Sequence, residues 1–67
     1  MDLREARLKA RRTQAGLARD VGLKQGTISA YEAGTRQPPV NTARAIEEAL
    51  GLPPGSIEWP NPKEASA

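Results

Sequence analysis

Residues 14–31 have the sequence QAGLARDVGLKQGTISAY, in which two short helical patterns flank a glycine. The inward positions of the two patterns are apolar: Leu17, Ala18 and Val21 in the first, Ile28 and Tyr31 in the second. Gly22 separates the patterns, because glycine can adopt the left-handed conformation at a helix C-terminus without a Cβ clash. Ala18 is small enough to let two backbones approach closely. The stretch therefore predicts two helices that cross at a steep angle, as in a helix-turn-helix.

The rest of the chain continues the helical pattern. We expect helices over residues 2–11, 14–20, about 25–33 and about 40–50, with a short helical turn at 56–59. Thr13 is a suitable N-cap, and Gly34 and Gly51 are suitable terminators. Two inward faces are expected: Leu3, Ala6, Arg7 and Ala10 in the first helix, and Val40, Ala43, Ile46 and Leu50 in the fourth. No strand pattern occurs, so the sequence predicts an all-α bundle of four to five helices.

The length of 67 residues allows one domain, which we expect over residues 1–59, followed by a disordered Pro-rich tail at 60–67. The chain has no cysteine and no histidine, which excludes disulfides and the common zinc sites. We therefore expect no metal and no cofactor. No apolar run approaches the roughly 20 residues of a membrane span, and no signal-peptide pattern occurs. A cytoplasmic protein is expected.

The charge is distributed unevenly along the chain. Residues 1–36 contain eight Lys or Arg and four acidic residues, which gives a net charge of +4. Residues 37–67 contain two Lys or Arg and four acidic residues, which gives a net charge of −2. A basic half that includes the two crossing helices is what attraction to DNA phosphates requires. A solvated charged surface would not predict this division. Charge and spacing together indicate a nucleic-acid-binding protein.

A series of residues at fixed spacing extends through most of the chain: Arg7, Thr13-Gln14, Leu17-Ala18, Val21-Gly22, Thr27-Ile28-Ser29, Glu32, Gly34, Pro38 and Ala49-Leu50-Gly51. In these positions the chain resembles the phage-repressor and Cro-type helix-turn-helix family, over about residues 3–59. The resemblance implies a lambda-repressor-like domain that binds duplex DNA, usually as a two-fold dimer on a near-palindromic site. Its third helix would lie in the major groove.

On that helix the expected base-contacting positions are Gln25, Gly26, Thr27, Ser29 and Ala30. Gln25 is the strongest candidate, because its amide can form a bidentate pair with adenine. Gly26 and Ala30 have no hydrogen-bonding side chain, where family members often have larger polar residues. Direct readout is therefore expected to be sparse, which leaves more discrimination to DNA shape.

The expected phosphate contacts are Gln14, Lys24, Thr35 and Arg36, with Arg11 and Arg12 as weaker candidates. Gln14 matches the family's phosphate-binding glutamine and begins a helix, whose N-terminus favours anions. Lys24 replaces the usual Ser or Thr cap of the third helix, at a cost of about 1 kcal/mol, and brings a cation to the DNA backbone.

The resemblance gives Arg7 and Glu32 a structural role, as a partly buried ion pair between the first and third helices. Two departures from the family pattern, Arg12 and Glu47, could compensate each other through a salt bridge or be independently exposed. Ile57 and Trp59 follow the fourth helix, where family members often dimerise. They are either a dimer contact or a cap over the monomer's core.

An enzyme is not expected, because the sequence offers no nucleophile with a base, no phosphate-binding loop and no paired acidic site. The expected function is a sequence-specific transcriptional regulator of phage or mobile-element type, more a repressor than an activator. The alternative is an antitoxin or adaptor whose C-terminal half binds a protein partner such as a toxin or antirepressor. The chain could also be the DNA-binding part of a larger protein.

Overall fold

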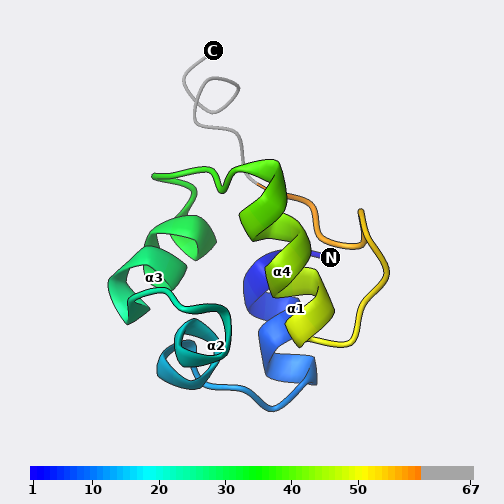
Figure 1. The fold of residues 1–67 in the computed structure, drawn as a ribbon, viewed down its shortest axis with the longest axis horizontal. Helices are drawn as coiled ribbons and strands as arrows, with labels where there is room; N and C mark the ends of the chain where they lie inside the picture. The colour runs from blue at the N-terminus through cyan, green and yellow to red at the C-terminus, as the bar shows by residue number, and fades with distance from the viewer. Residues whose placement is uncertain (60–67) are drawn as a thin grey trace.

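The computed structural model of the chain describes residues 1–59, which form four helices and no strand. The helices are α1 (Leu3–Lys9), α2 (Gln14–Val21), α3 (Gln25–Ala33) and α4 (Val40–Ala49) (Figure 1). The all-α prediction is confirmed, and α2 and α3 form the helix-turn-helix. The tail predicted to be disordered, residues 60–67, lies outside the described residues.

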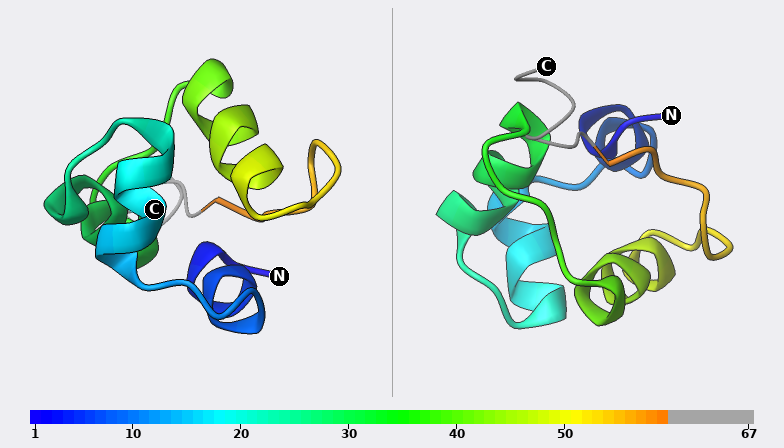
Figure 2. Two further views of the ribbon diagram at one scale, coloured as in Figure 1. Left: turned by 60° about the horizontal axis from the view of Figure 1, so that its bottom comes forward. Right: turned by 90° about the horizontal axis from the view of Figure 1, so that it is seen from above.

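The helix-turn-helix forms one side of the domain, and α1 and α4 form the other (Figure 1). The α2 helix packs against α3 and α4, while α1 packs against α3. After α4 the chain returns past the N-terminus, where the Glu58 N–H donates to the Met1 carbonyl at 2.9 Å (Figure 2). No helix in residues 1–59 is long and apolar enough to cross a membrane.

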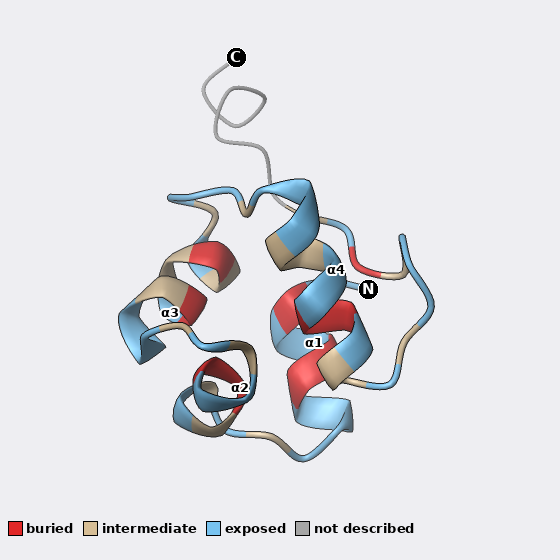
Figure 3. Ribbon diagram, in the orientation of Figure 1, coloured by how far each residue is buried: buried red, intermediate tan, exposed pale blue. Residues whose placement is uncertain are grey.

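One core joins all four helices and the segment that follows them (Figure 3). Its buried apolar members are Leu3, Ala6, Leu17, Ala18, Ile28, Tyr31, Ile46 and Ile57. Two predicted inward positions are wrong, because Ala10 is exposed and Val40 is 68% exposed. Both lie at the end of a helix, where the apolar spacing continues but the residue stays exposed to solvent.

The turn between α2 and α3 has the predicted geometry. Gly22 is left-handed at φ 73°, and the Leu23 N–H donates to the Ala18 carbonyl at 2.8 Å. At the start of α2 the Thr13 hydroxyl accepts from the Gly16 N–H at 2.9 Å. Lys24 provides no side-chain cap for α3, as expected. The Lys24 position therefore loses a stabilising bond and leaves helix donors at the start of α3 open.

The α1 helix is shorter than predicted at both ends. Asp2 is its N-cap and accepts from the Glu5 N–H at 2.8 Å. At the other end Arg11 has a φ of 58°, and the Arg12 N–H donates to the Arg7 carbonyl at 3.0 Å. This is the bonding of a helix terminator that usually contains glycine at the left-handed position. Because Arg11 is not glycine, this end of the helix could not be predicted from residue type.

The short helical turn predicted at 56–59 is wrong. Pro53 and Pro54 have no N–H to donate, the Gly55 and Ile57 N–H groups bind the buried carboxylate of Glu47, and the Ser56 N–H donates to the Pro53 carbonyl at 3.2 Å in a single turn. That carboxylate accepts from Gly55 N–H at 3.1 Å and from Ile57 N–H at 3.0 Å. The segment therefore forms an irregular turn that places Ile57 in the core.

Candidate nucleic-acid interface

The outer side of α3 is short of side chains that could contact bases. Gln25, Gly26 and Ser29 are exposed, while Thr27 and Ala30 are half-buried. Space above Gly26 is open, since a Cβ built there would contact nothing within 4 Å. The absence of a side chain at Gly26 is therefore not required by packing within the protein.

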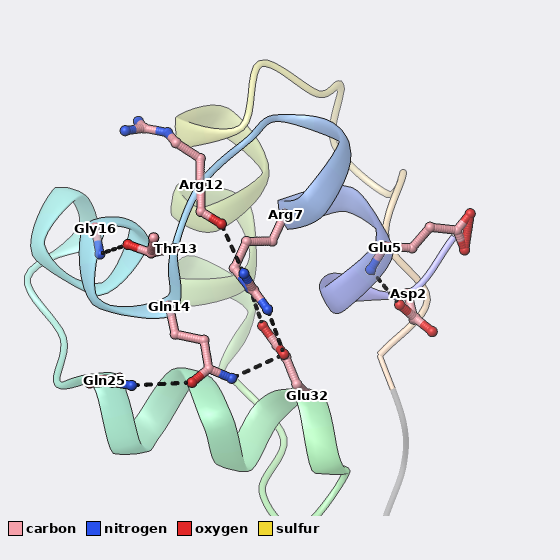
Figure 4. A network of polar contacts seen from close by, with 9 residues as sticks. All are labelled: Asp2, Glu5, Arg7, Arg12, Thr13, Gln14, Gly16, Gln25 and Glu32. Carbon is pink, nitrogen blue, oxygen red and sulfur yellow. Dashed lines mark hydrogen bonds and ion pairs between the residues drawn. The ribbon is translucent and has the colours of Figure 1, made fainter.

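The one long polar side chain in this set, Gln25, is held by α2. Its Nε2 donates to the Oε1 of Gln14 at 3.4 Å (Figure 4). The Nε2 of Gln14 in turn donates to Glu32 Oε1 at 3.1 Å. The two amides thus form a chain of contacts from Glu32 to the exposed start of α3.

Glu32 is fixed by Arg7, which reaches across from α1. Arg7 Nε donates to Glu32 Oε2 at 2.6 Å and Nη2 donates to Oε1 at 3.3 Å. The third guanidinium nitrogen, Nη1, donates to the Arg12 carbonyl at 2.8 Å. The side chains of Arg7 and Glu32 are only 10% and 7% exposed, so the pair lies largely away from water. Such charge-assisted, nearly bidentate contacts fix orientation as well as distance.

This chain of contacts determines how both amides are oriented. A carboxylate only accepts, so Gln14 must present its NH₂ group to Glu32 and its oxygen to Gln25. Gln25 must then present its NH₂ group to Gln14, which leaves its own oxygen and one N–H open. An amide with one free acceptor and one free donor matches the edge of adenine in the major groove.

The candidate phosphate contacts lie at the ends of the helix-turn-helix. Lys24 and Arg36 are exposed immediately before and shortly after α3. Thr35 is also exposed, but its hydroxyl donates to the Ala30 carbonyl at 3.3 Å. Thr35 can therefore donate to a phosphate only if that contact opens.

The suggested salt bridge between Arg12 and Glu47 is wrong. Arg12 pairs with Asp20 of α2, and Glu47 is 3% exposed with its carboxylate bound to the 55–57 turn. The alternative of independent exposure fails for Glu47 as well. Because Asp20 neutralises Arg12, this arginine becomes a poorer candidate for a phosphate contact.

A family model described as helix-turn-helix matches residues 3–57. The chain belongs to the Cro/C1-type helix-turn-helix family. The domains of this family are DNA-binding regulators of transcription rather than enzymes. No curated protein and no solved structure matches the chain.

In this helix-turn-helix domain Ile57 and Trp59 lie against the monomer's own core. Ile57 is 4% exposed and has almost no surface left for a second copy. The Trp59 ring packs edge-on against Tyr31, with ring centroids 6.3 Å apart and planes at 82°. Trp59 is half-buried and so retains some accessible surface. The segment after α4 therefore supports α3 from the side opposite its exposed face.

Sequence reasoning missed the side-chain contacts that Gln14 makes within the protein. The signal available was the pair of amides at the first positions of two helices joined by a tight turn. Whether two such positions lie close together can be predicted only when the crossing angle of the helices is known. The same reasoning missed the burial of Glu47, for which the Pro-Pro-Gly turn that begins six residues later was the only cue.

Proposed function

We propose that this helix-turn-helix domain is a sequence-specific repressor that places α3 in the major groove of duplex DNA. The observation that carries the proposal is the contact between Gln14 and Gln25. It orients the one long polar side chain on the exposed face of α3. An amide oriented before binding loses less conformational entropy when it pairs with a base.

The small residues on the same face fit this arrangement. Gly26 and Ala30 let the α3 backbone approach the base edges closely, and the Ala30 methyl suits contact with a thymine methyl. Thr27 and Ser29 add hydroxyls that can donate to or accept from a base or a phosphate. With few base contacts, the sequence-dependent shape of the DNA contributes a large share of the specificity.

Cations at both ends of α3 would hold the domain on the duplex. Lys24 and Arg36 are placed to contact phosphates along the walls of the groove, as is the backbone N–H of Gln14 at the first position of α2. Repression would follow from occupancy of an operator that overlaps a promoter.

We further propose that two copies bind a near-palindromic operator. A two-fold dimer places two recognition helices about 34 Å apart on one face of the DNA, which fits two half-sites one turn apart. Trp59 is the better candidate for the contact between copies, since Ile57 is buried within the monomer.

The test is selection of bound duplexes from a random DNA pool at near-physiological salt, followed by sequencing. Enrichment of two inverted half-sites about one helical turn apart would support a dimeric operator-binding protein. Enrichment of one short motif would support sequence-specific binding by a monomer and overturn the dimer. No enrichment would overturn the proposal in favour of the antitoxin or adaptor role, whose binding lacks the steep salt dependence of phosphate contacts.

A further inference from the structure

A polar hollow of about 280 Å³ lies between α1 and α3, next to the contacts that hold Gln25. It is lined by Arg4, Arg7, Gln14, Ser29, Glu32 and Ala33. Gln14 and Ser29 both belong to the proposed DNA-binding face, so the hollow is continuous with that face. Arg4 is the member that the proposed function does not use.

The position of Arg4 follows from the helix spacing. Arg4 precedes Arg7 by three residues, which places it one turn earlier on the same side of α1. Since Arg7 reaches Glu32 on α3, Arg4 lies on the edge of α1 that borders α3. Ser29 and Ala33 are likewise four residues apart and form the facing edge of α3.

The charge of the hollow favours an anion. Arg4 and Arg7 contribute two positive charges and Glu32 one negative charge, which leaves a net charge of +1. The carboxylate of Glu32 is occupied by Arg7 and Gln14, so the uncompensated charge belongs to Arg4. Arg4 is exposed, and within residues 1–59 it forms no ion pair.

The hollow offers the donors that a phosphate group needs. The Arg4 guanidinium can donate two parallel N–H groups, and the exposed Ser29 hydroxyl lies on the opposite wall. Ala33, the last residue of α3, has no polar side chain that could donate to a DNA phosphate beside the groove.

We propose that Arg4 is a DNA-binding residue that donates to a backbone phosphate beside the groove occupied by α3. The interface then extends from the helix-turn-helix to α1 and gains a contact that α3 does not supply. The inference rests on the proposed function, because the phosphate belongs to the duplex that α3 enters.

The experiment compares Arg4→Ala with Arg19→Ala in the full chain. Arg19 is also an exposed helical arginine, but it lies toward the opposite end of α2 from Gln14, so it controls for the loss of one charge. Affinity is measured over a range of salt concentrations for a selected duplex and for an unrelated duplex, each of about two helical turns. Circular dichroism checks that each variant is folded.

Arg4→Ala is expected to weaken binding to both duplexes by the same factor. The slope of log affinity against log salt should become shallower by about 0.9, the value for one lost phosphate contact, and Arg4→Lys should restore most of it. Arg19→Ala should leave the slope at the parental value.

Three results would contradict the inference. If the unsubstituted chain binds DNA and Arg4→Ala and Arg19→Ala have the same affinities and salt slopes, the inference is overturned and the proposed function stays intact. A loss confined to the selected duplex, with an unchanged salt slope, would make Arg4 a base-contacting residue. If the unsubstituted chain binds neither duplex, the proposed function is overturned together with this inference.

Discussion

The Oε1 of Gln14 lies 3.4 Å from the Nε2 of Gln25, and this contact joins the first residue of α2 to the first residue of α3. It is the outermost member of a set of contacts that begins at the buried Arg7. A change at the buried end should therefore alter the orientation of the exposed amide, even though the two ends lie on different helices.

Gln25→Ala should weaken binding to the selected duplex by about 1–3 kcal/mol and relax the preference at one base pair, because a bidentate base contact is lost. The measurement is affinity for a panel of duplexes that carry each base at every operator position. Lys24→Ala is the comparison, since the neighbouring cation should contribute to every duplex alike and reduce the salt slope by about 0.9. If Gln25→Ala kept the parental preference at every position, Gln25 would not be a base contact.

Gln14→Ala should lower affinity for all duplexes, because the amide N–H that Glu32 does not occupy is lost as a phosphate donor, and it should also loosen Gln25. The two substitutions should then be non-additive, with a coupling energy of at least about 0.5 kcal/mol on the selected duplex. A double-mutant cycle with Gln25→Ala measures this coupling. Additive effects would mean that the contact between the two amides does not persist in the complex.

Arg7→Met should lower the free energy of unfolding by about 3–5 kcal/mol, because it leaves the Glu32 carboxylate buried without a cation. A loss of this size is comparable to the whole stability expected of a domain this small. Lys9→Met is the matched control, since its pair with Glu5 is exposed and worth at most about 0.5 kcal/mol. Thermal unfolding followed by circular dichroism compares the two, and equal melting temperatures would contradict the structural role of Arg7.

Glu47→Ala should destabilise the domain by at least about 2 kcal/mol, because the Gly55 and Ile57 N–H groups lose a charged acceptor. The neighbouring Glu48 is exposed, so Glu48→Ala should change stability little. The chain has one tryptophan, and its fluorescence reports on the segment that Glu47 holds. The emission of Trp59 should shift to longer wavelength in the Glu47 variant alone; a shift of equal size in the Glu48 variant would disprove the assignment.

Arg11→Gly should raise the free energy of unfolding by about 1 kcal/mol relative to Arg11→Ala. Both variants lose the same charge, but only glycine adopts the left-handed conformation at φ 58° without a steric cost. Chemical denaturation of the two variants measures the difference. Equal stabilities would mean that the end of α1 relaxes in solution.

Features that depend on a few neighbouring residues could be predicted from residue type and spacing. Gly22 marked the turn, and the spacing of Leu17, Ile28 and Tyr31 marked the buried face, because backbone sterics and helical periodicity act within one or two turns. The uncapped Lys24 followed from residue type alone. Such local rules failed where the chain departs from them, as at Arg11, which occupies a position usually held by glycine.

The pairing of polar groups that are distant in the sequence depends on how the helices pack together. Glu47 is a polar residue in a helix, and it is buried because the turn at 53–57 supplies two donors to its carboxylate. Gln14 contacts both Glu32 and Gln25 because α2 and α3 cross at the angle that brings three separate turns together. These pairings depend on distances and angles between elements. A pattern along one helix contains no information about them.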